Sequence, residues 1–194
     1  TPIGKITQTV LSWVFKDNTI KRKSIEKQLK TQSIESIKLT KSQQDIYNRI
    51  VINHEKPHFI HGVPGSGKTE IYLTLCNHYI NQKKSCLVLV PEIALSSQIF
   101  ERFQEFYGHN VFLWHSQTTD SYRKKILKKI NQTDPCIVIG ARSALFTPLK
   151  NLGLIIVDEE HDSSYKEVEK QPCYNARDLS IVRAKFSNAP IVLG

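Results

Sequence analysis

The stretch Gly62-Val-Pro-Gly-Ser-Gly-Lys68-Thr69 indicates the fold, because it joins a glycine-rich loop to the start of a helix. It fits the pattern G-x-x-x-x-G-K-[ST], in which the glycines let consecutive backbone N–H groups turn inward around a phosphate. The apolar pair Phe59-Ile60 precedes the loop, and apolar residues at helical spacing follow it. A strand, a phosphate-binding loop and a helix in this order predict a nucleotide-binding α/β domain.

Two residues at the end of the loop are expected to act on the nucleotide directly. Lys68 can reach the outer phosphates, and the Thr69 hydroxyl can help to hold Mg²⁺, which prefers hard oxygen ligands. The sequence therefore predicts ATP and Mg²⁺ as cofactors. The loop residues expected to bind the nucleotide are Gly62, Val63, Pro64, Gly65, Ser66, Gly67, Lys68 and Thr69.

A second motif, Asp158-Glu159-Glu160-His161-Asp162, follows the continuous apolar run Leu154–Val157. Such a run is typical of a parallel strand that is buried on both faces, so Asp158 is expected at the carboxyl end of a strand, where open α/β sheets bind ligands. Asp158 is expected to hold Mg²⁺, and Glu159 to orient and deprotonate the attacking water. A solvated acidic turn is the alternative, but the upstream phosphate loop favours an ATP-hydrolysing motor.

Composition is consistent with a basic globular domain. The chain has 194 residues, of which 40% are hydrophobic, enough for one core. Its net charge of +9 favours nucleic acid as a partner. The basic run Arg123–Lys129 is nevertheless expected to be mainly the solvated face of a helix whose other face carries Tyr122, Ile126 and Ile130.

Cysteine usage and hydropathy exclude several other classes of protein. Cys76, Cys86, Cys136 and Cys173 form no C-x-x-C pair, which argues against a zinc site or a disulfide framework and favours reduced thiols in the cytoplasm. No run approaches the roughly 20 apolar residues that a membrane span requires, so no membrane partner is expected.

From Leu39 onward, short apolar runs alternate with helical stretches, which predicts a doubly wound parallel sheet. Core stripes are expected on two of the helices, one with Leu95, Ile99, Phe103 and Phe106 and the other with Leu179, Val182 and Phe186. The expected strands are Phe59-Ile60, Cys86–Val90, Val111–Trp114, Cys136–Ile139, Leu154–Val157 and Ile191–Leu193.

The N-terminal part is polar and rich in lysine, and we read residues 16–38 as a linker between residues 1–15 and the nucleotide-binding lobe, residues 39–194. The chain contains no methionine and begins with Thr1, so it is expected to be an internal fragment of a longer protein.

Several segments around the two motifs resemble the PriA family of replication-restart helicases within superfamily 2. The combination of IGARSALF with DEEHDSSYK is more specific than the nucleotide motifs alone. The resemblance implies a RecA-like first motor lobe, with the second lobe absent, of a 3′-to-5′ DNA helicase that acts at stalled or branched replication forks. The matching segments are Gly62–Leu73, Leu87–Gln98, Trp114–Ser116, Ile137–Leu149, Leu152–Lys166 and Tyr174–Asp178.

The resemblance also implies roles for residues outside the nucleotide motifs. Gln43 matches a glutamine that reads adenine, with Gln44 as the fallback, and His161 matches a histidine that couples the nucleotide site to the following loop. A buried histidine without a catalytic part is the alternative for His161, and an intramolecular salt bridge is the alternative for Arg142. The residues implied in nucleic-acid binding are Arg142, Ser143, Tyr165, Lys166 and Tyr174.

Partners follow from the same resemblance. They are forked and single-stranded DNA, other primosome proteins, a replicative helicase loader and single-strand-binding protein. Residues 1–15 resemble the end of the family's DNA-binding N-terminal domain, and zinc is expected only in the absent second-lobe region. The isolated chain is expected to hydrolyse ATP poorly, because the second lobe supplies the arginine finger. Glu167 and Cys173 depart from the glutamine and arginine expected at their positions.

Two other functions stay open from sequence. One is another superfamily 2 translocase, such as an RNA helicase or a restriction-type motor, which would share the nucleotide motifs. The other is a non-catalytic DNA-binding module that uses nucleotide as a switch, although such a module has less need of a water-activating carboxylate at Glu159.

Overall fold

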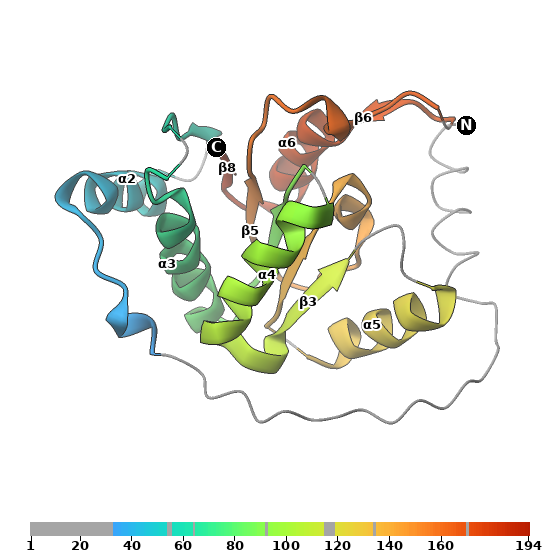
Figure 1. The fold of residues 1–194 in the computed structure, drawn as a ribbon, viewed down its shortest axis with the longest axis horizontal. Helices are drawn as coiled ribbons and strands as arrows, with labels where there is room; N and C mark the ends of the chain where they lie inside the picture. The colour runs from blue at the N-terminus through green and yellow to red at the C-terminus, as the bar shows by residue number, and fades with distance from the viewer. Residues whose placement is uncertain are drawn as a thin grey trace.

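The computed structural model describes residues 33–194, except 54–55, 64, 92, 115–118, 134 and 170. The predicted tail 1–15 and most of the predicted linker 16–38 lie outside these residues. Within them, parallel strands form a six-stranded sheet in the order β1-β8-β5-β2-β4-β3, with helices on both faces (Figure 1). This arrangement confirms the predicted doubly wound parallel sheet.

Each predicted strand run overlaps a strand of the sheet. The central strands are buried on both faces, which explains why their sequences are continuously apolar. Alternate residues of β2 enter two separate clusters, with Cys86 and Val88 on one face and Leu87 and Leu89 on the other. The strands are β1 His58–Phe59, β2 Ser85–Leu89, β3 Val111–Trp114, β4 Ile137–Gly140, β5 Leu152–Val157 and β8 Ile191–Leu193.

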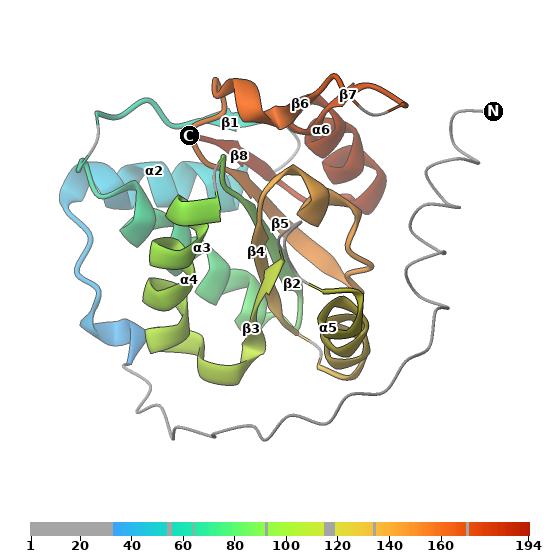
Figure 2. The same ribbon diagram turned by 45° about the vertical axis from the view of Figure 1, so that its right-hand side comes forward.

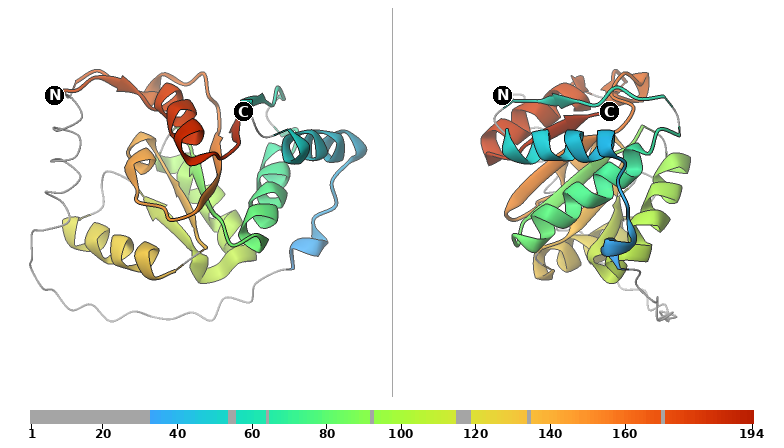
Figure 3. Two further views of the ribbon diagram at one scale, coloured as in Figure 1. Left: turned by 180° about the vertical axis from the view of Figure 1, so that it is seen from behind. Right: turned by 90° about the vertical axis from the view of Figure 1, so that its left-hand side faces the viewer.

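Two layers of helices cover the sheet. Helices α2 (Lys41–Ile52), α3 (Lys68–Asn81) and α4 (Ile93–Tyr107) pack on one face, and α5 (Asp120–Gln132) and α6 (Ala176–Ser187) pack on the other. Figure 2 shows the strands between these layers, and Figure 3 shows α5 (yellow) and α6 (red) from behind.

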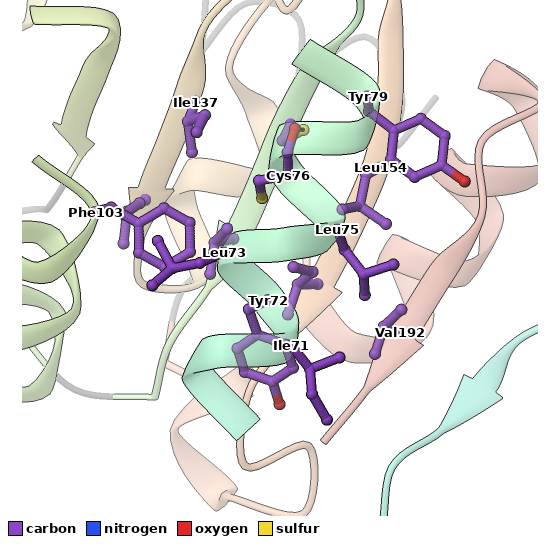
Figure 4. Packing of buried hydrophobic residues seen from close by; sticks show 14 of the residues in the cluster. Ile71, Tyr72, Leu73, Leu75, Cys76, Tyr79, Phe103, Ile137, Leu154 and Val192 are labelled. Carbon is purple, nitrogen blue, oxygen red and sulfur yellow. Dashed lines mark hydrogen bonds between the residues drawn. The ribbon is translucent and has the colours of Figure 1, made fainter. Parts of the chain in front are cut away.

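Helix α3 is the central element of the first layer. Its Tyr72, Leu73, Leu75 and Cys76 are fully buried and pack against Phe103 of α4 and against the sheet (Figure 4). Truncating such a buried side chain to alanine typically costs about 2–5 kcal/mol. The core therefore fixes the helix that follows the phosphate loop.

The face of α6 differs from the prediction. Val182 and Phe186 are 47% and 87% exposed, whereas Ala176, Ser180 and Ala184 are buried. The predicted stripe is wrong for Val182 and Phe186 but not for Leu179, which is partly buried and packs against the core. The fully buried positions are small residues, which allow the helix to lie close to the sheet. On α5, Ile126 and Ile130 are buried as expected, whereas Tyr122 of the same predicted stripe is 49% exposed. Arg123 is buried rather than solvated.

Several short elements were not predicted. Strands β6 (Lys166–Glu167) and β7 (Tyr174–Asn175) form an antiparallel hairpin, preceded by the 3-10 turn η4 (Ser163–Tyr165). The turn η1 (Ile34–Ser36) lies within the predicted linker, and Ile34 packs against the core. The packed part of the chain therefore begins before residue 39. The remaining turns are η2 Gly108–Asn110 and η3 Arg142–Phe146.

The described residues can be compared with the expectations about disulfides and membrane spans. Cys76, Cys86 and Cys136 are buried as free thiols, and Cys173 is exposed and also free. Over the described ranges, no helix is both long and apolar enough to cross a membrane.

Candidate active site

The phosphate loop lies between the end of β1 and the start of α3. Gly65 and Gly67 have φ of 80° and 81°, a left-handed conformation that glycine adopts without strain. Gly67 is the N-cap of α3, and Lys68 is the first helical residue. The N–H groups of the first turn of α3 therefore lie at the end of the loop, where a phosphate site requires them. Pro64 lies outside the described residues.

Gln43 holds this loop from the start of α2. Its Nε2 donates hydrogen bonds to the carbonyl oxygens of Ser66 (3.2 Å) and Gly67 (3.4 Å), and its Oε1 accepts one from the Thr40 N–H (2.8 Å). A Cβ at Gly67 would lie 2.3 Å from the Gln43 Nε2, so this contact also requires glycine. The amide of Gln43 is thus engaged with the loop, and its adenine-reading role stays a prediction. Gln44 bonds Asn48 instead (3.0 Å).

The two nucleotide motifs meet at Lys68. Its Nζ lies 2.7 Å from the Glu159 Oε1 and 4.0 Å from the Asp158 Oδ1. The Lys68 and Asp158 side chains are 13% and 14% exposed, whereas Glu159 is 34% exposed. Thr69 lies half-buried in the first turn of α3. The fold therefore brings together the predicted phosphate-binding lysine and the predicted metal-binding and water-activating carboxylates.

Tyr72 is a functional candidate that the sequence did not suggest. It lies one helical turn after Lys68, and its hydroxyl donates a hydrogen bond to the Asp158 Oδ1 (3.0 Å). Burial raises the pKa of the Asp158 carboxyl, while the Tyr72 hydrogen bond and the Lys68 charge oppose this rise. Burial, with the Asp158 carboxylate adding to it, raises the pKa of Tyr72 far above its usual value, so the phenol stays a donor.

The turn after β5 aims Glu159 at Lys68. Glu159 has a φ of 46°, a left-handed conformation that costs a non-glycine residue on the order of 1 kcal/mol or more. Two backbone hydrogen bonds hold the turn, from the Glu160 N–H to the Gly194 oxygen (2.8 Å) and from the Asp162 N–H to the Glu159 oxygen (2.9 Å). Backbone strain at this position is therefore part of the site.

His161 lies at the edge of the site. Its side chain is 75% exposed, and its Nε2 lies 3.7 Å from the Glu159 Oε2, beyond hydrogen-bond distance. The buried histidine considered from sequence is therefore wrong. A hydrogen bond from His161 to the following loop does not occur among the described residues, so its coupling role stays a prediction.

Arg142 forms an intramolecular salt bridge, which was the alternative to its implied role in nucleic-acid binding. Its Nη2 lies 3.0 Å from the Glu167 Oε2, and its Nη1 donates to the carbonyl oxygens of Ser164 (3.2 Å) and Lys166 (2.8 Å). Arg142 therefore ties η3 to the β6–β7 hairpin. Since Glu167 is one of the departures from the expected sequence, this ion pair is a feature of this chain.

The other predicted nucleic-acid residues fall into two groups. Tyr165 is 1% exposed and donates a hydrogen bond to the Asp158 carbonyl oxygen (2.6 Å), so its side chain is not accessible for the nucleic-acid contact that the resemblance implies. Tyr174 is half-buried, with its ring edge-on to Phe146 at 5.3 Å. Lys166 is exposed and Ser143 half-exposed, so both remain accessible to a ligand.

Two contacts that sequence reasoning missed stabilise this second region. The Ser164 Oγ donates a hydrogen bond to the Pro91 carbonyl oxygen (2.7 Å), so η4 bridges the loop after β2 and Arg142 of η3. Arg183 of α6 donates to the carbonyl oxygens of Leu145 and Thr147 at the end of η3. Burial lowers the pKa of Arg183 to about 10. No local pattern signals either contact, because each joins segments far apart in sequence.

Comparison with known proteins gives consistent matches. A family model described as DEAD/DEAH box helicase matches residues 40–190. The "Replication restart protein PriA" of Rickettsia conorii is 43% identical over 191 residues, which cover 98% of this chain and 29% of the relative. The protein of the same name from Helicobacter pylori is 48% identical over 133 residues, or 69% of this chain and 21% of the relative.

A solved structure of RecG bound to a three-way DNA junction has the same fold. It matches with a TM-score of 0.59 and 25% identity over 80% of this chain and 20% of that chain. This likeness supports the RecA-like architecture predicted from the sequence. The chain spans less than a third of the length of the curated relatives it matches.

Proposed function

The chain belongs to the DEAD/DEAH box helicase family, and we propose that its residues 39–194 form the first motor lobe of a cytoplasmic, ATP-dependent DNA helicase of replication restart. The observation that carries the proposal is the 2.7 Å contact between Lys68 of the phosphate loop and Glu159 of the acidic motif. The relatives named PriA support the assignment to replication restart. Polarity from 3′ to 5′ and action at forks are part of the proposal. So are residues 1–15 as a domain end and, as a linker, the part of 16–38 that precedes the packed turn η1.

The donor set fits Mg²⁺ and the phosphates of ATP. The Asp158 carboxylate and the Thr69 hydroxyl are hard oxygen ligands of the kind that Mg²⁺ binds beside phosphate oxygens. When bound, the ion neutralises charge that develops on the phosphates. The loop N–H groups around Gly65 and Gly67 would hold the phosphates.

Lys68 and Glu159 would act in sequence. We propose that Lys68 exchanges Glu159, now 2.7 Å away, for an outer phosphate, because the phosphate carries more negative charge than the carboxylate. This exchange releases the Glu159 carboxylate, which is 34% exposed, to orient a water and accept its proton. Binding of the phosphate thus prepares the base.

The nucleic-acid side of the lobe would include η3 and the β6–β7 hairpin. Lys166 and Ser143 are accessible there, and Arg142 could bind a backbone phosphate in exchange for Glu167. Because the Tyr174 ring packs against Phe146, it would lie beside the bound nucleic-acid strand rather than stack on its bases. DNA, single-stranded or forked, is the proposed ligand, and the primosome proteins, helicase loader and single-strand-binding protein are proposed as partners of the whole protein.

Glu167→Gln is expected to tighten binding of single-stranded DNA. The change keeps the side-chain shape but removes the charge that pairs with Arg142 at 3.0 Å. The Arg142 end of the pair is 34% exposed and screened by solvent, whereas Glu167 is buried (8%), and we expect the affinity to rise about two- to fivefold. The slope of log K against log salt should also steepen as Arg142 gains a phosphate. A salt titration of DNA binding by the full-length protein measures both.

Glu169→Gln is the matched control for this change. Glu169 lies on the same hairpin, and its exposed side chain does not contact Arg142 among the described residues. The substitution therefore removes the same charge without freeing the guanidinium. Equal effects of the two variants would show that net charge, and not release of Arg142, sets the affinity.

ATP hydrolysis by the full-length protein tests the proposed function as a whole. The assay compares forked DNA, single-stranded DNA and single-stranded RNA, with Lys68→Ala as the blank. We expect the strongest stimulation by forked DNA. Equal or stronger stimulation by RNA would favour another superfamily 2 translocase, and hydrolysis unaffected by any nucleic acid would favour the nucleotide-switched module.

A further inference from the structure

Tyr72 of α3 contacts the Asp158 carboxylate from within the core. Its ring projects from the early turns of the helix among fully buried neighbours (Figure 4), and the residue is 0% exposed. Its hydroxyl reaches the Asp158 Oδ1 at 3.0 Å. Because the ring is enclosed by protein, the hydroxyl has a fixed position relative to the carboxylate.

The surroundings of the hydroxyl leave little room for another arrangement. A Cβ at Gly194 would lie 1.9 Å from the Tyr72 Oη, so the end of β8 admits the phenol only because it is glycine there. The Gly194 N–H donates to the Val157 oxygen (2.9 Å), immediately before Asp158. A buried hydroxyl without an acceptor would cost about 1–3 kcal/mol, so the contact with Asp158 is favoured strongly.

Lys68 cannot provide the same restraint throughout a catalytic cycle. Its Nζ lies 4.0 Å from the same Oδ1 but 2.7 Å from Glu159, and in the proposed function it leaves Glu159 for an outer phosphate. Tyr72 belongs to the packed part of α3 and remains in place. The orientation of the Asp158 carboxylate therefore depends on Tyr72 when Lys68 binds elsewhere.

We infer that Tyr72 is a positioning residue for Mg²⁺: by holding Oδ1, it sets the direction in which the Asp158 carboxylate presents itself to the ion. The inference rests on the proposed function, in which Asp158 binds the Mg²⁺ of Mg·ATP. Groups that orient metal-binding carboxylates in this way typically change metal affinity about 10- to 100-fold when they are removed.

Tyr72→Phe in the full-length protein tests the inference, because it keeps the ring and its packing but removes the hydroxyl. Binding of a fluorescent ADP analogue is measured in EDTA and over a range of Mg²⁺ concentrations. We expect the Mg²⁺ concentration at half-effect to rise about tenfold, with the affinity in EDTA unchanged. This difference separates positioning of the metal ligand from damage to the phosphate loop.

Tyr107→Phe is the matched control. The Tyr107 hydroxyl also bonds α3, at the Leu73 carbonyl oxygen (2.6 Å), but makes no contact with the site. It should leave both affinities unchanged. An unchanged Mg²⁺ dependence in Tyr72→Phe, or equal losses with and without Mg²⁺, would overturn the inference alone. If nucleotide binding by the unmodified protein did not depend on Mg²⁺, both the inference and the proposed function would be overturned.

Discussion

Lys68→Ala in the full-length protein is expected to lower DNA-stimulated ATP turnover by about 10²- to 10³-fold, the usual effect of removing one preorganised donor from developing negative charge. The phosphate loop would keep its backbone, since Gly65 and Gly67 and the contacts of Gln43 are untouched. The loss should therefore fall mainly on turnover, with a smaller effect on nucleotide binding. Steady-state ATP hydrolysis and nucleotide titration measure the two quantities separately.

The same change also alters the electrostatics of the site. The Lys68 ammonium offsets the charge of both carboxylates: its Nζ lies 4.0 Å from the Asp158 Oδ1 and 2.7 Å from the Glu159 Oε1. Without it, the two carboxylates repel each other across a partly buried site, and part of the loss would come from a disturbed Asp158. Lys128→Ala, on the exposed face of α5, removes an equal charge far from the site and should leave turnover unchanged. Turnover of Lys68→Ala close to that of this control would contradict the proposed mechanism.

The fold was predictable because its strongest signal is local. Strands β2, β4 and β5 are buried on both faces, so their residues had to be apolar without interruption, and glycine-rich or polar segments mark their ends. The β6–β7 hairpin escaped prediction because two-residue strands carry no measurable alternation. The buried face of helix α6 was predicted wrongly for another reason: its sheet-facing residues, such as Ala184, are less apolar than the exposed Phe186.

Only the residues of the site that belong to a local sequence motif were predictable. Lys68, Asp158 and Glu159 belong to patterns with a known chemistry, and the parallel sheet brings such patterns to one edge. Tyr72 and Ser164 act through contacts between distant segments, which no spacing reveals. Tyr165 shows the opposite error, because an aromatic residue in a polar loop reads as exposed, yet the turn after β5 buries it against the Asp158 carbonyl.

Glu159→Gln is expected to separate nucleotide binding from hydrolysis. Removing a general base costs about 10²- to 10⁴-fold in turnover. The glutamine keeps the shape of the side chain and its place in the turn, but it can no longer form the 2.7 Å ion pair with Lys68. Lys68 is then free to bind the outer phosphate, so the affinity for Mg·ATP should stay the same or increase. Equilibrium binding and single-turnover hydrolysis in the presence of single-stranded DNA provide the measurement.

Glu160→Gln is the control, because Glu160 is adjacent but pairs with Arg177 at 3.0 Å and does not contact Lys68. It should cause a much smaller loss of turnover than Glu159→Gln and no gain in affinity. If both variants hydrolysed ATP equally well, Glu159 would be only a counter-ion for Lys68, as a nucleotide switch requires. A loss confined to Glu159→Gln, with tight binding retained, would instead show that the Glu159 carboxylate acts on water, as the proposed motor requires.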